Sequence, residues 1–554
     1  MTPGAAAAAA VRGETPAGTS RAGLAAAPPA GVRVIVGGSG ADAGAQTSAA
    51  VAAVKTAGGR VERLLPLIGG VAAAVPGSEL PALMSAGSVR SVSPDARMTV
   101  QDSAATVDIA DGEETESSEP RSVHRTEIGA DRALAEGADG SGVTVALLDT
   151  GISPHPDLAG RVVPVHNATT GAYEQCVNLS GESDCSDGYG HGTFLAGLIA
   201  GSGADSGGRY AGVAPRAKLL SIKVGARDGS ADVSNVLAGI QWAVSFRERY
   251  GIRVLNLSLG TDSRQPWQSD PLNYAVERAW QAGIVVVVSA GNLGSGASTI
   301  TKPADDPWVI TVGAADDRTT PAISDDRLPL FSSRGPTAAG LVKPDVVAPG
   351  AKLVSTRAYG EIDEQVPPAM PGSYRQGSGT SMATAVVSGG VAQMLSREPA
   401  LSPNRVKFLV TSTARPVASA SANDVGRGMV DVYAAMTSTE AGSANGGLQT
   451  SSGSGSLQDS RGTVRVASEP SGVVVDGVLT AQLLVWEPTQ LLGEWGATAW
   501  YASSWAESPI YRSAWSDGSW SGHNWTGSEF YEELDTTTFY GHNWQGADWY
   551  GAWE

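Results

Sequence analysis

Six short runs of valine, isoleucine and leucine most constrain how this chain can fold. They lie at residues 143–148, 219–224, 254–257, 284–289, 309–312 and 346–348. Each run is almost continuously apolar, which is typical of parallel strands buried on both faces, whereas strands with one solvated face alternate apolar and polar residues. Amphipathic helical stretches, such as residues 233–244, separate the runs. The pattern predicts an α/β fold with three layers, in which helices flank a parallel β-sheet on both faces.

A smaller α+β unit is predicted ahead of this segment, at residues 31–101. The expected strands lie at 32–36, 60–65, 67–75 and 89–92, and the expected helices at 47–57 and 78–85. This β-α-β-β-α-β order is that of a ferredoxin-like arrangement. The glycine loop at 37–40 resembles part of a dinucleotide-binding fingerprint. Because Ala43 replaces its third glycine, this partial motif is weak evidence for such a site.

Composition divides the rest of the 554-residue chain. Residues 1–30 are rich in Ala, Gly and Pro and predict a disordered leader. Residues 102–125 form an acidic linker ahead of the main domain at 126–436, and residues 437–475 form a Ser/Gly-rich linker. Residues 476–554 are an acidic tail that holds ten of the 14 tryptophans and repeats them on a short period.

Charge and hydropathy exclude two classes of protein. The formal net charge is −18, whereas nucleic-acid binding requires Lys and Arg to neutralise phosphates. No stretch approaches the ~18 consecutive apolar residues that a membrane-spanning helix needs. The first residues carry an alanine run without a basic segment before it, so they show no clear secretory signal.

The two cysteines, Cys176 and Cys185, lie in a Ser/Gly/Asp-rich stretch with no histidine nearby. They are therefore either two free thiols or the ends of a small disulfide loop formed in an oxidising compartment.

Three windows in the main domain carry residues suited to nucleophilic catalysis. Asp149 ends the first apolar run, where open parallel sheets place their active sites. His191 stands between two glycines at the start of an apolar helix, and Ser381 follows a glycine turn that leads into another helix. A serine at a helix N-terminus has an exposed oxygen and a free backbone N–H.

Each window alone is ordinary, because such residues usually serve turns, caps or the core. Together they supply a nucleophile, a base and an orienting carboxylate in the order Asp…His…Ser. An esterase of the α/β-hydrolase type is excluded, because it requires Gly-x-Ser-x-Gly and the order Ser…Asp…His, and Ala383 occupies the last glycine position.

These windows resemble the three signature motifs of the subtilisin-like serine peptidases, the subtilases. The motifs are Asp149-Thr150-Gly151, His191-Gly192-Thr193 and Gly379-Thr380-Ser381-Met382-Ala383. Further segments of the family pattern match at 152–158, 210–215, 256–260, 289–292, 331–336 and 343–350. The resemblance covers residues 126–436.

The resemblance implies a role for each matching residue. Ser381 would attack the peptide carbonyl, His191 would accept and return its proton, and Asp149 would orient the imidazole. The side chain of Asn292 and the backbone N–H of Ser381 would stabilise the oxyanion. A further set, Ser258, Leu259 and Gly260, would hold the substrate backbone as an added strand.

Some positions depart from the family pattern. Ala385 replaces a common proline, and Phe194 replaces a common histidine. Calcium is common in the family and Asp157 matches one of its ligands, but the partner loop at 201–210 differs, so a metal there is not supported. The chemistry itself requires no cofactor.

Residues 32–99 resemble the inhibitory propeptide of the family. The resemblance implies a zymogen that cleaves itself between residues 98 and 127 and is inhibited by its own propeptide. A propeptide implies export, to a secreted or cell-surface location, and this favours a disulfide between the two cysteines. The tryptophans of the tail would either stack on cell-wall glycans or pack on one another.

The sequence therefore predicts a secreted serine endopeptidase that acts on proteins or peptides. The alternative is a catalytically inactive relative that keeps the fold as a peptide-binding or scaffold module. The presence of Asp149, His191, Ser381 and Asn292 together favours the enzyme.

Overall fold

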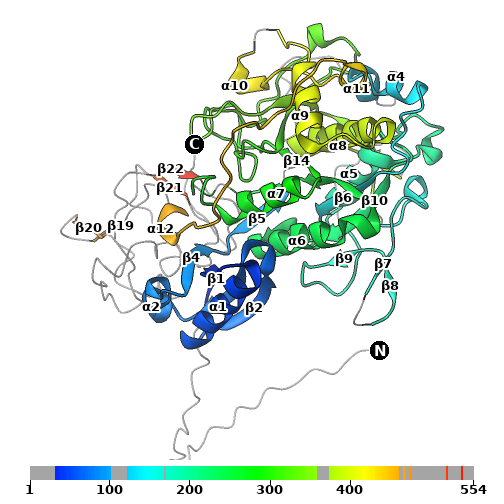
Figure 1. Cartoon of the computed structure of the whole chain (residues 1–554). Helices are drawn as coiled ribbons and strands as arrows, with labels where there is room; N and C mark the ends of the chain where they lie inside the picture. The colour runs from blue at the N-terminus through cyan, green and yellow to red at the C-terminus, as the bar shows by residue number, and fades with distance from the viewer. Residues whose placement is uncertain are drawn as a thin grey trace, which may run out of the picture.

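The structure is a computed structural model of the whole chain (Figure 1). It describes residues 31–100, 122–167, 170–261, 263, 265–358, 373–418 and 420–460. It also describes two short strand pairs, formed by β19 (Val466–Ser468) with β20 (Val473–Val475) and by β21 (Ser519–Ser521) with β22 (Thr538–Tyr540). The predicted leader, most of the acidic linker and, apart from these strands, the Trp-rich tail lie outside the described residues.

A seven-stranded parallel sheet forms the centre of the large domain, residues 122–437. Its strand order is β16-β15-β14-β12-β6-β10-β9. The strands are β6 (Thr144–Asp149), β9 (Val177–Asn178), β10 (Lys218–Lys223), β12 (Ile252–Leu257), β14 (Val285–Ser289), β15 (Ile310–Ala315) and β16 (Val346–Pro349). Six of these are the predicted apolar runs, and the short β9 was not predicted. The predicted parallel α/β fold is confirmed.

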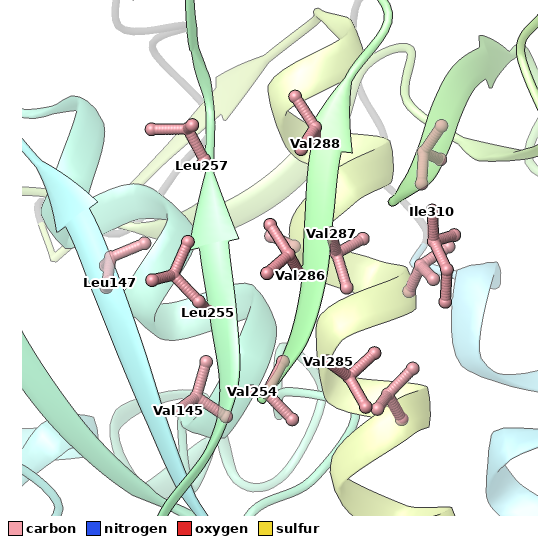
Figure 2. Packing of buried hydrophobic residues seen from close by; sticks show 14 of the residues in the cluster. Val145, Leu147, Val254, Leu255, Leu257, Val285, Val286, Val287, Val288 and Ile310 are labelled. Carbon is pink, nitrogen blue, oxygen red and sulfur yellow. The ribbon is translucent and has the colours of Figure 1, made fainter. Parts of the chain in front are cut away.

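The apolar strands are buried on both faces because helices cover both. Every residue of β14 is buried, and Figure 2 shows its valines packed between β12 and β15. In Figure 1 the sheet lies between one helix pair, α5 (His191–Ala200) and α8 (Thr380–Arg397), and a second pair, α6 (Val233–Tyr250) and α7 (Pro271–Gln281). The continuous apolar sequence of these strands thus has its physical cause in two covered faces.

Shorter elements complete the large domain. Ser402 caps α9, since its side chain accepts a hydrogen bond from the Arg405 N–H. The α-helices are α3 (His124–Glu127), α4 (Ala130–Ala135), α9 (Pro403–Ser412), α10 (Ala422–Val425) and α11 (Val432–Thr437). The strands are β7 (Val165–His166), β8 (Tyr173–Glu174), β11 (Ser230–Asp232), β13 (Leu259–Gly260), β17 (Leu353–Thr356) and β18 (Tyr374–Gly377). The 3₁₀ turns are η3 (Pro156–Leu158), η4 (Ala204–Ser206) and η5 (Ile323–Asp325).

The N-terminal unit, residues 31–100, has the predicted order of elements. Its four-stranded antiparallel sheet has the order β2-β3-β1-β4. Its elements are β1 (Val32–Gly38), α1 (Ala43–Thr56), β2 (Arg60–Leu65), η1 (Pro66–Ile68), β3 (Gly70–Val75), η2 (Gly77–Glu79), α2 (Leu80–Ser85), β4 (Val89–Pro94) and β5 (Arg97–Val100). Several details differ from the prediction: Leu67 lies in a 3₁₀ turn before β3, α1 begins at Ala43 rather than at residue 47, and β5 was not predicted.

The two faces of this small sheet pack against different partners. Val34 and Val36 belong to a core that the unit forms with its own helices. Ile35 and Ala72, on the opposite face, belong to the core of the large domain. The N-terminal unit therefore docks through one whole face of its sheet.

Residues 438–460, called the strap below, follow α11 and end in α12 (Leu457–Ser460). Their composition predicts a flexible linker, but they are packed against the rest of the chain. In Figure 1 the strap runs from α11 across the large domain to α12, beside β4.

Candidate active site

The predicted carboxylate and imidazole lie together at the carboxyl end of the central strand β6. Asp149 is the last residue of this strand and His191 is the first residue of α5, and both side chains are buried. His191 Nδ1 lies 2.7 Å from Asp149 Oδ1. The same oxygen accepts a hydrogen bond from the Thr150 N–H, at 2.8 Å. The carboxylate is thus fixed in position to orient the ring and to stabilise an imidazolium.

Glycine at position 192 allows this close approach of helix and strand. A Cβ at Gly192 would lie 2.1 Å from the Gly151 carbonyl oxygen and 3.2 Å from Asp149 Cβ. Any side chain there would push α5 away from the end of β6. The glycine that follows the histidine in the motif therefore has a steric cause.

Asp187 organises the start of α5, and it was not singled out in the sequence. Its Oδ1 accepts hydrogen bonds from the Gly190 N–H and the Thr150 hydroxyl, both at 2.7 Å. Its Oδ2 accepts from the N–H and the hydroxyl of Thr193, also at 2.7 Å. An aspartate shortly before a helix is the sequence signal for such a cap. This buried carboxylate ties the turn before His191 to the residue after Asp149.

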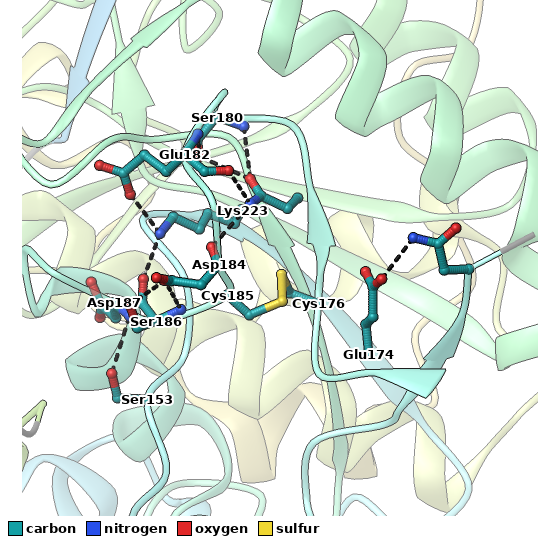
Figure 3. Close-up of a disulfide and its surroundings, with 12 residues drawn as sticks. Ser153, Glu174, Cys176, Ser180, Glu182, Asp184, Cys185, Ser186, Asp187 and Lys223 are labelled. Atoms are coloured by element: carbon teal, nitrogen blue, oxygen red, sulfur yellow. Dashed lines mark hydrogen bonds and ion pairs between the residues drawn. A yellow bond between two sulfur atoms is a disulfide. The ribbon is translucent and has the colours of Figure 1, made fainter. Parts of the chain in front are cut away.

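A disulfide loop leads directly into Asp187. Cys176 and Cys185 are joined, as the resemblance implies (Figure 3). The buried Lys223, at the end of β10, lies 2.7 Å from the Glu182 carboxylate and donates to the Ser186 carbonyl at 2.5 Å. These contacts fix the loop to the sheet edge beside the Asp149–His191 pair.

Ser381 lies in the first turn of α8, next to the segment that carries Asn292. Asn292 Oδ1 accepts hydrogen bonds from the N–H and the hydroxyl of Thr380, both at 3.0 Å. Because these bonds hold the amide oxygen of Asn292 at Thr380, its amide NH₂ points away from Thr380. The predicted oxyanion donor and the predicted nucleophile are thus placed by adjoining residues.

The starts of α5 and α8 are close in space. A Cβ at Gly377 would lie 2.9 Å from Met382 Cε and 3.1 Å from Phe194 Cζ. Phe194 follows His191 on the first turn of α5, and Met382 follows Ser381 on the first turn of α8. The two helices therefore bring the histidine and serine motifs together. The Phe194 departure fills the space between them with an aromatic ring.

The chain's own strand β5 lies beside the predicted substrate-binding strand. β5 is the middle strand of a three-stranded antiparallel sheet with the order β11-β5-β13. Val100 pairs with Leu259 and Thr99 with Gly260, and the Val100 N–H donates to the Gly229 carbonyl at 3.0 Å. Two of the three predicted substrate-binding residues thus hold an added strand from the N-terminal unit.

The third predicted substrate-binding residue connects this strand to the nucleophile. The Ser258 carbonyl lies 3.5 Å from Ser381 Oγ. Ser258 directly precedes Leu259, which pairs with Val100. β5 therefore runs towards the nucleophile.

Side chains anchor the N-terminal unit beside this strand. Met98 is completely buried in the core of the large domain. The Asp95 carboxylate caps α6, because it accepts the Ser234 N–H and hydroxyl at 2.8 Å each, and it pairs with Arg33 at 2.8 Å. Burial raises the pKa of Asp95 to about 6, although Arg33 acts in the opposite direction. No sequence pattern pointed to this buried carboxylate at the contact between the two units.

The residues at the family's calcium position do not fit a metal ion. Asp157 is fully buried, and its Oδ2 accepts the Tyr374 hydroxyl at 2.8 Å. Its Oδ1 accepts the Asp205 N–H at 3.0 Å. Both carboxylate oxygens thus have protein donors. Among the described residues, no group of three or more His, Cys, Asp or Glu side chains is arranged to hold a metal.

The comparisons with known proteins agree with this geometry. The model of the subtilase family matches residues 140–455, more than half of the chain. The chain belongs to the subtilase family.

Two curated relatives carry matching names. The chain is 42% identical over 299 residues to serine protease AprX of Bacillus subtilis (strain 168), across 53% of this chain and 65% of that protein. It is 38% identical over 309 residues to Subtilisin BL of Lederbergia lenta, across 56% of this chain and 96% of that protein.

A solved structure extends the similarity beyond the large domain. This is fervidolysin from Fervidobacterium pennivorans, described as a keratinolytic enzyme related to subtilisin. The two structures align with a TM-score of 0.55 and 27% identity, over 74% of this chain and 61% of that one. The chain thus spans somewhat less than two thirds of both fervidolysin and AprX.

No helix in the described part of the chain is long and apolar enough to cross a membrane.

Proposed function

We propose that this protein is a serine endopeptidase that hydrolyses peptide bonds in proteins through an acyl-enzyme. The observation that carries this proposal is the 2.7 Å contact between Asp149 and His191, beside the helix start that bears Ser381. Family membership supports it, because the match to the subtilase family covers residues 140–455, which include Asp149, His191 and Ser381. A static binding module requires no buried Asp–His pair at the end of its central strand.

We propose one step for each of these groups. Ser381 Oγ attacks the substrate carbonyl carbon and His191 Nε2 takes the hydroxyl proton, while Asp149 stabilises the resulting imidazolium. The C–N bond then breaks, and His191 gives the proton to the leaving amine. Water, activated by the same imidazole, hydrolyses the acyl-enzyme and returns Ser381 to its resting form. The Asn292 amide and the Ser381 N–H stabilise the oxyanion in both halves.

The N-terminal unit is proposed to be an inhibitory propeptide that the enzyme removes itself. Support comes from β5, which lies antiparallel to β13 and ends with Val100 opposite Leu259. The paired part of β5 thus ends one position short of the point opposite Ser258, whose carbonyl lies 3.5 Å from Ser381 Oγ. We therefore place the first cut at the Gln101–Asp102 bond, within the range 98–127 expected from the sequence.

Three further proposals concern the substrates, the location of the protein and the Trp-rich tail. Protein or peptide substrates would occupy the β11 and β13 edges that β5 occupies here. A secreted or cell-surface location agrees with the disulfide at Cys176 and Cys185. Glycan binding by the Trp-rich tail remains a prediction from sequence.

Mass spectrometry of the purified full chain tests the function. Wild type is incubated near pH 8 beside Ser381→Ala, with Ser396→Ala, on the same helix α8, as the matched control. We expect fragments 1–101 and 102–554 from wild type and from the control, and an intact chain from Ser381→Ala. An intact wild-type mass without fluorophosphonate labelling at Ser381 would favour the inactive peptide-binding module instead.

A further inference from the structure

The strap contacts both units of the protein. It begins at residue 438, directly after α11, and reaches the N-terminal unit at α12. Since β4 and α12 lie next to each other in Figure 1, a segment late in the chain meets one of its first strands. The contacts at the two ends of the strap differ in kind.

On the large domain, the strap is held by hydrogen bonds. The Trp308 indole N–H donates to the Gln449 carbonyl at 2.9 Å. The Ser451 N–H donates to both oxygens of the buried Glu277, at 2.9 and 2.8 Å, and the Ser452 N–H donates to the Gln268 carbonyl at 2.7 Å. This half of the strap is therefore fixed by polar contacts that the N-terminal unit does not share.

On the N-terminal unit, the strap is held by an apolar side chain. Leu457 is 1% exposed and belongs to the unit's own core, together with Val92 of β4. Ser456 forms a parallel bridge with Val92, and the Ser91 hydroxyl donates to the Gly453 carbonyl at 3.3 Å. The core of the N-terminal unit is thus completed by a residue that follows the large domain in the sequence.

We propose that the strap is a clamp that keeps the N-terminal unit on the active site after the chain has been cut. This proposal rests on the proposed function, because it concerns the state of the protein after the first cleavage. A cut at Gln101–Asp102 removes the covalent link between the units but leaves β5 in the groove and Leu457 in the core of the fragment. Release then requires the Leu457 contact to break together with β5, the docked face of the sheet and the hydrogen bonds between Asp95 and Ser234.

The clamp acts by raising the effective concentration of the fragment. While Leu457 is seated, a β5 strand that leaves the groove stays near it and returns. Loss of Leu457 would also expose apolar surface on the core side of β4. The strap therefore delays the appearance of peptidase activity without touching the residues that perform the chemistry.

The experiment compares wild type with Leu457→Asp and with Leu448→Asp, whose leucine is an exposed strap residue. Each full-length protein is allowed to process itself. Fragment retention is then followed by size exclusion, and activity by hydrolysis of a peptide substrate. We expect the Leu457→Asp fragment to leave about 30-fold faster than the wild-type fragment, with a shorter lag in activity. Leu448→Asp should behave as wild type.

Equal release rates in wild type and Leu457→Asp would overturn the clamp. An unprocessed wild-type chain would instead overturn the proposed function, so the two failures are distinct. If Leu457→Asp fails to fold, Leu457→Ala replaces it, with release again expected to be about 30-fold faster.

A second measurement does not depend on processing. Hydrogen exchange of β1 and β4 is compared in the Ser381→Ala chain with and without Leu457→Asp. Faster exchange with the second substitution supports the clamp, and unchanged exchange contradicts it.

Discussion

The large domain and the N-terminal unit solve the problem of burying a sheet in different ways. The seven parallel strands of the large domain are covered on both faces by helices of the same domain. The four antiparallel strands of the N-terminal unit are covered on one face by α1 and α2, and on the other by the large domain. Leu457 of the strap fills a place in the unit's own core. The large domain covers both faces of its sheet with its own helices. The N-terminal unit depends on the large domain and the strap to cover its second face and to complete its core.

The difference follows from size. A unit of roughly 70 residues buries a smaller share of its surface than a domain of several hundred, so its stability is marginal. Docking supplies what the small core lacks, and it does so at the groove that leads to Ser381. Because the N-terminal unit depends on the large domain for stability, it is suited to remain docked for a time and then to dissociate.

The largest expected effect separates the chemistry of the large domain from the docking of the small unit. Asn292→Ala removes an oxyanion donor and should lower kcat by about 10²–10³-fold, while KM and the rate at which the N-terminal fragment dissociates once it has been cut stay near wild type. Steady-state kinetics on a peptide substrate provide the measurement. A variant with unchanged kcat would remove Asn292 from the mechanism.

The next effect concerns the docking of the N-terminal unit on the large domain. Met98→Ala leaves a gap in the large-domain core where β5 docks, and such truncations cost about 2–5 kcal/mol. Once processing is complete, the N-terminal fragment should therefore leave at least about 30-fold faster, as measured by the gain of activity with time. Leu64→Ala, at a 54% exposed position of the same unit, is the matched control. Equal rates for the two variants would show that the unit docks without this side chain.

A smaller effect, on pH dependence, tests the stability of the large domain. Burial, together with the neighbouring Asp326 carboxyl, raises the pKa of Glu127 to about 10 from an ordinary value of 4.5. The folded chain then holds a proton that the unfolded chain loses above pH 4.5, so this contribution to stability falls as pH rises from about 4.5 to about 10. Glu127→Gln removes this loss.

Thermal unfolding between pH 5 and pH 9 measures the effect. The Tm advantage of Glu127→Gln over wild type should grow with pH, by about 2–4 °C for each kcal/mol recovered. Glu440→Gln, at an exposed position, should show no such trend. Parallel Tm curves for wild type and Glu127→Gln would contradict the assignment.

The last prediction is that the removal of calcium has no effect on Tm or activity. Because Tyr374 and Asp205 satisfy both oxygens of Asp157, the described part of the large domain should hold itself together at this position without calcium. EDTA should leave Tm and activity unchanged, as measured by calorimetry and peptide hydrolysis. A fall in Tm that added calcium reverses would contradict this prediction.

The sequence predicted the parts of the fold that obey local rules. Continuous apolar runs predicted six of the seven parallel strands, because burial on both faces leaves that pattern. The two-residue strand β9 has no such pattern, since the disulfide loop and its pairing with β10 hold it in place. Leu67 was assigned to a strand because its apolar neighbours continue into β3, but Pro66 opens a 3₁₀ turn there.

The site was predictable where motifs are local and not where contacts are distant. Asp149 and His191 were found by motif, and the structure places them 2.7 Å apart. Asp187 serves the same helix, but a lone aspartate before a glycine-rich turn is too common to be singled out. The strap resembles a linker by composition, since its Ser and Gly residues act through backbone hydrogen bonds that composition does not reveal.

The seat of Leu457 in the N-terminal core has a consequence for the order in which the protein is made. Val92 is synthesised before the large domain and Leu457 after it, so their contact closes a very long loop. Domains usually fold in the order of their synthesis, and contacts of high sequence separation form slowly. The N-terminal unit is thus synthesised before the large domain but completed after it, and a nascent chain that stops short of Leu457 carries an N-terminal unit with an open core.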